Sequence, residues 1–181
     1  MNYIVFDLEC TCWLGSPPHN RQEIIEIGAV FINDYGEVED FFSEFVRPVV
    51  NPLISKFCTE LTGITQSQVN RAKEFRDVVE RFKDWVNVGQ EEYVLLSWGG
   101  FDKRMLASDC ELHRLDWAWT EKHADLKKQY QRFKKLKNQP GLLKSVEREG
   151  FVFEGTNHRA IDDAKNTAKI FIRHLEEWQY Y

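Results

Sequence analysis

The chain has 181 residues with a formal net charge of −5, and 43% of the residues are hydrophobic. This length suits a single domain, residues 1–181, with a full-sized hydrophobic core. No run of about 18 apolar residues occurs, so we expect no membrane-spanning helix, and the first residues lack the features of a signal peptide. The four cysteines are therefore expected to be reduced thiols, and the protein to be cytoplasmic.

The first part of the chain is rich in residues that favour β-strands. Runs of β-branched and aromatic residues predict strands at residues 3–9, 24–32 and 38–46. Residues 13–22 contain Gly, Pro and Asn and are expected to form a loop, whereas Asn33 to Gly36 is typical of a hairpin turn. The three strands should therefore pair as an antiparallel meander.

The rest of the chain alternates between helix and strand signals. Apolar spacing and turn residues predict helices at residues 54–61, 74–88, 101–112, 126–136, 142–149 and 160–178. Strands are expected at residues 93–98 and near the start of the ambiguous segment 117–126. This order of elements predicts an α/β fold in which helices flank a mixed central sheet.

Positive charge is concentrated in one segment of the chain. Residues 122–148 contain nine Lys or Arg residues and two acids, so this segment carries +7 while the remainder carries −12. Such asymmetry marks either a solvated helix face or a surface that binds the backbone of a nucleic acid. The candidate phosphate contacts are Lys127, Lys128, Lys134 and Lys135.

Two acids end the first predicted strand, which is otherwise apolar. Asp7 and Glu9 are two residues apart, so their side chains project from the same face of that strand. Two neighbouring carboxylates repel each other, which raises the pKa of one of them, and a divalent cation relieves this repulsion. The alternative is that the strand simply ends in solvent, where both acids are hydrated.

A third acid, Asp102, follows the apolar run 93–96 and the tight turn 98–101, where a helix is expected to begin. An acid in the first turn of a helix is ordinary, because it interacts favourably with the helix dipole. However, a hydrophobic strand, a tight turn and then an acid is also the way in which α/β sheets present active-site groups at strand ends.

The segment 157–164, Asn-His-Arg-Ala-Ile-Asp-Asp-Ala, contains the last candidates. Asp163 comes five positions after His158, so the two can serve one site only if His158 lies on the loop before the helix. A helix capped by Asn157 or His158 would satisfy this condition. Otherwise His158 is a surface histidine, and Asp162 and Asp163 are an acidic first turn.

Together these residues predict a metal-dependent hydrolase. Four carboxylates without balancing basic residues can hold two Mg²⁺ or Mn²⁺ ions roughly 3.5–4 Å apart, and oxygen ligands favour such hard cations over zinc. A loop histidine beside them can act as general base toward water. This combination is typical of phosphodiester hydrolysis; its members are Asp7, Glu9, Asp102, His158 and Asp163.

The same residues make the chain resemble the DEDDh 3′–5′ exonucleases of the RNase H-like superfamily. The three motifs of that family correspond to residues 6–11, 101–102 and 158–164, with the H-x(4)-D spacing of the histidine subclass. Residues 6–13 and 23–30 further resemble the Eri-type branch, which includes the 3′ histone-mRNA exonuclease. Two further stretches, 57–58 and 61–66, support the same branch.

The resemblance implies an RNase H-like fold and a role for each matched residue. Asp7, Glu9 and Asp163 would bind the metal pair, Asp102 would complete it, and His158 would deprotonate the attacking water. The reaction would release nucleoside 5′-monophosphates from single-stranded 3′ ends of RNA. The resemblance also implies a set of substrate contacts, which comprises Cys10, Thr11, Phe57, Thr62 and Phe101.

Several alternatives remain at the level of sequence. Cys10 and Thr11 should approach the terminal 3′-hydroxyl, whereas Phe57 and Phe101 either stack on the last bases or belong to the core. A DNA-directed exonuclease of the proofreading or repair type would share the same chemistry. A nucleic-acid-binding protein without catalysis and a scaffolding domain are the other hypotheses.

Overall fold

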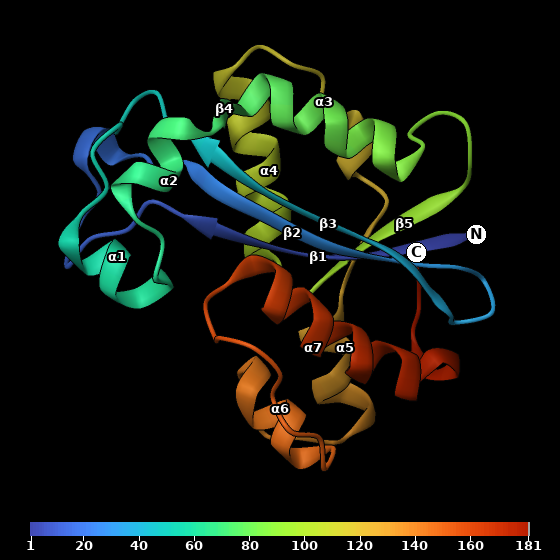
Figure 1. Ribbon diagram of the computed structural model, residues 1–181. Helices are drawn as coiled ribbons and strands as arrows, with labels where there is room; N and C mark the ends of the chain where they lie inside the picture. Colours follow the sequence, from blue (N-terminus) through green and yellow to red (C-terminus); the bar gives the residue numbers. More distant parts are fainter. Residues whose placement is uncertain (181) are drawn as a thin grey trace.

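The computed structural model describes residues 1–180 and is organised around a six-stranded mixed sheet, with strand order β4-β3-β2-β1-β5-β6 (Figure 1). The strands are β1 (Asn2–Cys10), β2 (Ile24–Ile32), β3 (Val38–Arg47), β4 (Lys73–Glu74), β5 (Tyr93–Ser97) and β6 (His123–Asp125). Strands β1, β2 and β3 pair antiparallel, while β5, β6 and β4 add parallel pairings. The predicted mixed sheet with an antiparallel meander is therefore confirmed.

Helices cover both faces of this sheet. They are α1 (Lys56–Thr62), α2 (Gln66–Arg71), α3 (Phe75–Val86), α4 (Phe101–Leu112), α5 (Leu126–Phe133), α6 (Leu142–Arg148) and α7 (Ala160–Arg173). Helices α3 and α4 pack on one face, whereas α7, with α5 and α6 beside it, packs on the other (Figure 1). Because both faces are covered, every residue of β2 is buried, which explains why its sequence is apolar except for Glu26.

Helix α7 lies unusually close to the sheet at its first turn. A Cβ atom built at Gly28 of β2 would lie 2.1 Å from the backbone nitrogen of Ile161, which is impossible without moving the helix. Gly28 therefore lets the start of α7 rest directly on the β2 backbone. This close contact fixes the position of the loop that precedes α7.

The structure differs from the sequence expectations in its shortest elements. Helix α2 and strand β4 were not predicted, and the short strand in segment 117–126 lies at its end, as β6, because residues 118–120 form a 3₁₀ turn. Helix α5 ends at Phe133, since Lys135 has a left-handed backbone with φ of 54°. Helix α7 ends at Arg173 and is followed by a 3₁₀ turn. Within residues 1–180, no helix is both long and apolar enough to cross a membrane.

Candidate active site

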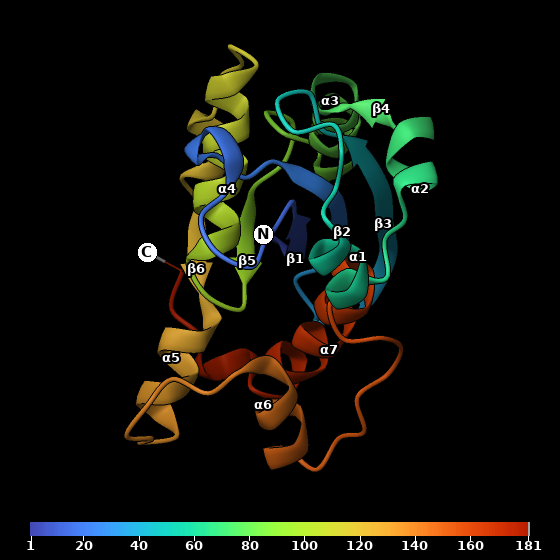
Figure 2. The same cartoon turned by 90° about the vertical axis from the view of Figure 1, so that its left-hand side faces the viewer.

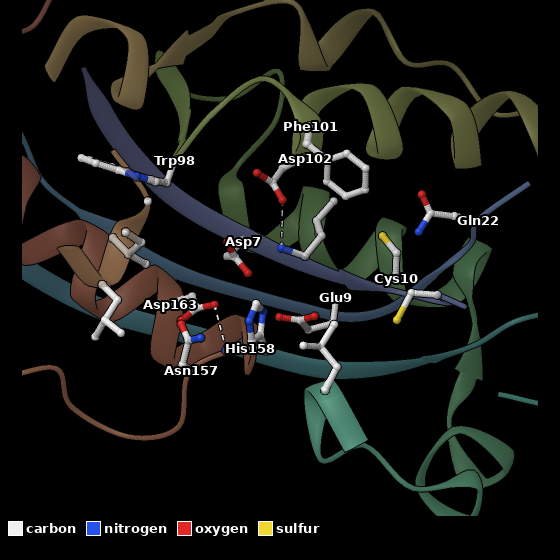
Figure 3. A pocket seen from close by; sticks show the side chains of 16 residues that line it. Asp7, Glu9, Cys10, Gln22, Trp98, Phe101, Asp102, Asn157, His158 and Asp163 are labelled. Carbon is white, nitrogen blue, oxygen red and sulfur yellow. Dashed lines mark hydrogen bonds between the residues drawn. The ribbon is translucent and has the colours of Figure 1, made fainter. Parts of the chain in front are cut away.

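The five residues of the predicted hydrolytic site line one pocket of about 470 Å³ (Figure 3). This pocket lies at the end of the sheet where β1 terminates, and α1, α4, α6 and the start of α7 surround that end (Figure 2). The tertiary structure thus brings together side chains that are up to 156 positions apart in the chain. They are Asp7, Glu9, Asp102, His158 and Asp163.

Strand β1 and helix α4 contribute the first three acids. The alternation of the strand places Asp7 and Glu9 on one face, as expected, and both line the pocket. Asp102 lies in the first turn of α4, where its Oδ1 accepts a hydrogen bond from the backbone N–H of Leu8 at 3.3 Å. This bond ties α4 to the residue between the two β1 acids, so the three carboxylates are held at one place.

The loop before α7 contributes the histidine. His158 has φ of 64°, a left-handed conformation that is uncommon for a residue with a side chain. Its backbone N–H donates to Oδ2 of Asp163 at 3.2 Å. The condition set by their spacing is met, because His158 precedes the helix while Asp163 lies in its first turn. The expected cap was wrong: the N-cap residue is Arg159, and neither Asn157 nor His158.

Three of the five residues form the tightest group. Each of Glu9, His158 and Asp163 offers a potential ligand atom, and these atoms all lie within 4.8 Å of one another. Glu9 and Asp163 are buried, with 8% and 7% of their surface exposed. Oδ1 of Asp163 is buried without a hydrogen-bond partner among the described residues. An orphaned carboxylate oxygen at such a position fits a hard divalent cation.

The electrostatics of the pocket favour the same conclusion. Burial and the charges of neighbouring carboxylates raise the pKa of Glu9 to about 8 and the pKa of Asp7 well above its usual range. Burial also raises the pKa of Asp102 and of Asp163 to about 7, although backbone hydrogen bonds partly oppose it. The acids therefore lack sufficient positive charge around them, which is the state expected of groups that accept cations.

The predicted substrate contacts are distributed unevenly. Cys10 and Phe101 line the pocket, and Phe101 is 40% exposed, so it is available for stacking. Thr11 and Thr62 are buried outside the lining, where their hydroxyls accept from Glu23 N and donate to Cys58 O respectively. These two hydroxyls stabilise the chain, and Phe57 lies half-buried on α1 without lining the pocket.

The four predicted lysines also differ in their surroundings. Lys134 forms an ion pair of 2.8 Å with Glu149, which holds it against the protein. Lys128 and Lys135 are exposed, whereas Lys127 is half-buried. The side chain of Lys127 lies near Gly99, a residue of the turn that leads to Asp102. Lys127, Lys128 and Lys135 therefore remain the better candidates for contacts with phosphate, because they do not share the ion pair of Lys134.

Sequence reasoning missed most of the apolar wall of the pocket. This wall includes Trp98 and four leucines, of which Leu61 is 38% exposed and Leu143 is 43% exposed. The indole N–H of Trp98 donates to the carbonyl of Pro140 at 3.1 Å and so holds the start of α6 beside the carboxylates. A leucine at a helix start looks like a core residue in sequence, so no signal identified it. The missed lining residues are Leu8, Cys12, Gln22, Leu61, Trp98, Gly141, Leu142, Leu143 and Asn157.

A mixed sheet flanked by helices, with four carboxylates and a histidine at one strand end, defines a metal-dependent nuclease of the RNase H-like type. The exonuclease family of the RNase T type matches residues 4–171. The chain belongs to this family, and within it to the DEDDh exonucleases of the Eri type. The predicted RNase H-like fold and the family resemblance are both confirmed.

Individual relatives agree with this assignment. Human 3′-5′ exoribonuclease 1 is 37% identical over 181 residues, which cover 96% of this chain and 52% of that protein. The nuclease domain of 3′hExo, a DEDDh family member solved bound to rAMP, is 36% identical with a TM-score of 0.88, and covers 97% of this chain and 92% of that one. A 3′-exonuclease whose structure concerns 3′-end-specific recognition of the histone mRNA stem-loop is 34% identical with a TM-score of 0.89, over 99% of this chain and 83% of that one. The chain spans about half the length of the curated exoribonuclease 1 relatives it matches.

Proposed function

We propose that the protein is a metal-dependent 3′–5′ exoribonuclease that removes nucleotides from single-stranded 3′ ends of RNA. The observation that carries the proposal is the convergence of four carboxylates and His158 in one pocket from β1, α4 and the start of α7. Relatives named exoribonucleases, and one solved with a bound ribonucleotide, support RNA as the substrate. They favour RNA over the DNA-directed alternative.

The acidic residues would bind the cations. Asp7, Glu9 and Asp163 would hold two Mg²⁺ or Mn²⁺ ions, and Asp102 would complete their coordination. When bound, the cations supply stabilisation of the charge that develops on the reacting phosphate and make water easier to deprotonate. Two of these carboxylates are held by backbone N–H groups: Asp102 accepts from Leu8, and Asp163 accepts from His158.

His158 would act as the general base of the reaction. Its imidazole would accept a proton from a water molecule, whose oxygen forms a new bond to the phosphorus of the last phosphodiester. The bond from that phosphorus to the 3′-oxygen of the preceding nucleotide breaks, and this oxygen takes a proton from the solvent. The products are a nucleoside 5′-monophosphate and an RNA chain shortened by one residue, with a free 3′-hydroxyl.

The shape of the pocket suits the terminal nucleotide. Its volume of about 470 Å³ lies within the ~300–1,000 Å³ of small-ligand sites. The exposed ring of Phe101 and the apolar wall of Trp98 and Leu143 offer surfaces against which bases can pack without sequence preference. A relative recognises the histone mRNA stem-loop, whereas the substrate proposed for this chain is any single-stranded 3′ end of RNA. The cytoplasmic location stays a prediction.

Digestion of end-labelled oligonucleotides tests this proposal. RNA and DNA oligonucleotides of one sequence are labelled at the 5′ end. The RNA should give a ladder that shortens from the 3′ end, and the DNA should be degraded much more slowly or not at all. The same RNA labelled at the 3′ end should release the label as a mononucleotide. The reaction should need Mg²⁺ or Mn²⁺ and stop with a chelator. Equal rates on DNA, internal cleavage or activity in the chelator would contradict it.

A further inference from the structure

A fifth acid lies directly behind the pocket and plays no part in the proposed chemistry. Glu26 of β2 is the antiparallel partner of Glu9 in β1, and only 1% of its surface is exposed. Its charge helps to raise the pKa of Glu9 and of Asp163, so it adds to the repulsion among the carboxylates. A buried charge that opposes its neighbours needs a compensating interaction.

That interaction is made with the two residues that follow His158. Nη2 of Arg159 lies 2.8 Å from Oε1 of Glu26, and Nε of Arg159 lies 3.2 Å from Oε2. The backbone N–H of Ala160, the first residue of α7, donates to Oε2 at 3.0 Å. A carboxylate on the strand therefore holds both the guanidinium and the helix start, in the two-point geometry that makes such pairs directional.

His158 has few other restraints. In the described part of the chain its imidazole takes part in no hydrogen bond, and the loop residues 154–157 just before it are exposed. Its left-handed backbone is held by its own N–H bond to Asp163 and by a bond from the N–H of Arg159 to the carbonyl of Thr156 at 3.2 Å. The contacts of Arg159 and Ala160 with Glu26 then fix this turn to the sheet. The guanidinium of Arg159 is itself held over the ring of Phe45, with Cζ 5.3 Å from the ring centre.

We propose that Glu26 and Arg159 are a positioning pair that holds the His158 turn in the orientation needed for proton transfer. This inference rests on the general-base role of His158 in the proposed function. The two residues act through His158 and are not assigned to substrate or metal. Losing the pair should let the turn shift, and a misplacement of about 1 Å costs about 10²-fold in rate.

A double-mutant cycle with His158 tests the pair. Glu26→Gln keeps the side-chain shape but removes the charge, and it is made in the wild-type chain and in His158→Ala. The kcat and KM for a short RNA are measured with Mg²⁺. We expect Glu26→Gln to lower kcat by about 10–10²-fold in the wild-type background, with KM unchanged. In the His158→Ala background it should change kcat less than about twofold, because nothing is left to position.

Two further variants keep the result interpretable if single changes impair folding. Arg159→Met alone leaves the Glu26 charge buried without its partner, which is strongly destabilising. The double variant Glu26→Gln/Arg159→Met removes both charges and should fold, yet it should show the same kcat loss. Arg159→Lys should recover part of kcat, since it restores the charge without the second hydrogen bond. Arg47→Met, which breaks the 2.7 Å surface pair with Glu74, is the matched control and should leave kcat unchanged.

The possible outcomes separate the explanations. Equal kcat losses in both backgrounds would show that the pair supports the whole pocket, and would overturn the inference. A rise in KM at constant kcat would show that Arg159 contacts RNA, and would also overturn it. A folded Glu26→Gln/Arg159→Met variant with the kcat of the wild type would also overturn the inference. Absence of wild-type activity on every 3′ end would overturn the proposed function itself, and this inference with it.

Discussion

Two buried glutamates in this protein have opposite electrostatic surroundings. Glu149, between α6 and α7, has a side chain that is 5% exposed and accepts hydrogen bonds from Tyr130 at 2.6 Å and from Lys134 at 2.8 Å. Burial alone would raise its pKa, but these bonds and one with His174 outweigh it and lower the pKa to about 2. Glu9 is similarly buried, but it has acids for neighbours, and its pKa rises to about 8.

The difference shows how burial of an acid can serve structure or function. Glu149 joins α5, α6 and α7 because each of its neighbours on them supplies a donor. Among residues 1–180, Glu9 has no comparable set of donors, so its charged form would be stabilised most by a bound cation. A buried glutamate thus stabilises helix packing at the C-terminal end of α7, as Glu149 does, and forms part of the candidate active site at its N-terminal end, as Glu9 does.

The largest expected effect is on activity when a pocket acid is changed. Asp7→Asn should reduce exonuclease activity below detection, because it removes a cation ligand and alters the charge of the site. The metal-free variant should melt no lower than the wild type, since one source of repulsion is gone. Single-turnover digestion of labelled RNA and thermal unfolding followed by circular dichroism measure the two effects.

Glu149→Gln is the matched control at the other end of α7. It should lower the free energy of unfolding by about 1–3 kcal/mol, because Tyr130 and Lys134 lose a charged acceptor. Its activity per folded molecule should equal that of the wild type below the melting temperature. If Asp7→Asn instead melts far below the wild type with a proportionate loss of activity, Asp7 has a structural role. The contrast between the pocket acids and Glu149 would then be wrong.

The second effect concerns the general base. His158→Ala should lower kcat by about 10²–10⁴-fold, the usual contribution of a positioned base. RNA affinity and Mn²⁺ affinity should be nearly unchanged, because the cations are assigned to the carboxylates. Calorimetric titration of Mn²⁺ into the variant measures the second quantity. A collapse of Mn²⁺ affinity together with the rate would make His158 a ligand, which its closeness to Glu9 and Asp163 would then explain.

The pocket acids and Glu149 should also change the stability of the fold in opposite directions as pH changes. The folded pKa of Glu9 is about 8 and exceeds the unfolded value of about 4.3, so its favourable contribution exists at low pH and is lost as pH rises through about 8. Asp102 and Asp163, with folded pKa values of about 7, follow the same sign. Glu149, with a folded pKa of about 2, contributes above its unfolded pKa and loses that contribution as pH falls toward 2.

This sign predicts how cations change stability. The metal-free protein should lose stability between about pH 5 and pH 8, and Mg²⁺ or Mn²⁺ should raise the melting temperature more at pH 8 than at pH 5.5. Thermal unfolding with and without the cation at both pH values checks this. Glu149→Gln should retain the whole cation-dependent shift, whereas Asp7→Asn should lose most of it. An equal shift at both pH values would contradict the sign.

The smallest effect is expected from the basic segment. The double variant Lys127→Glu/Lys128→Glu should weaken binding of long RNA a few-fold and make the salt dependence shallower, by about 0.7 in logarithmic slope for each lost phosphate contact. Dinucleotide cleavage should hardly change. Lys134→Glu differs, because it breaks the bond with Glu149 and should lower stability first. Fluorescence anisotropy at several salt concentrations measures the slope, and an unchanged slope would assign Lys127 and Lys128 to a solvated face.

The sequence predicted the fold and the candidate site well where local periodicity carries the information. The two-residue period of a strand places Asp7 and Glu9 on one face whatever the rest of the chain does. The regular apolar spacing of α3 located it within two residues, and α4 spans the residues predicted for it. Elements of two to six residues, α2, β4 and β6, were missed or misplaced, because so few residues carry no period and their pairing partners decide them.

Tertiary structure alone decided which candidates meet. Sequence spacing allowed His158 and Asp163 to share a site on one condition, and the contact of Glu26 with Ala160 shows how the fold meets it. Trp98 and Leu143 gave no sign of lining the pocket, and Thr62 gave no sign of being buried, because burial depends on neighbours distant in the chain. The direction of a side chain along a strand or helix is a local property of the backbone, so the sequence determined it. The proximity of two elements arises from packing, so only the tertiary structure decided it.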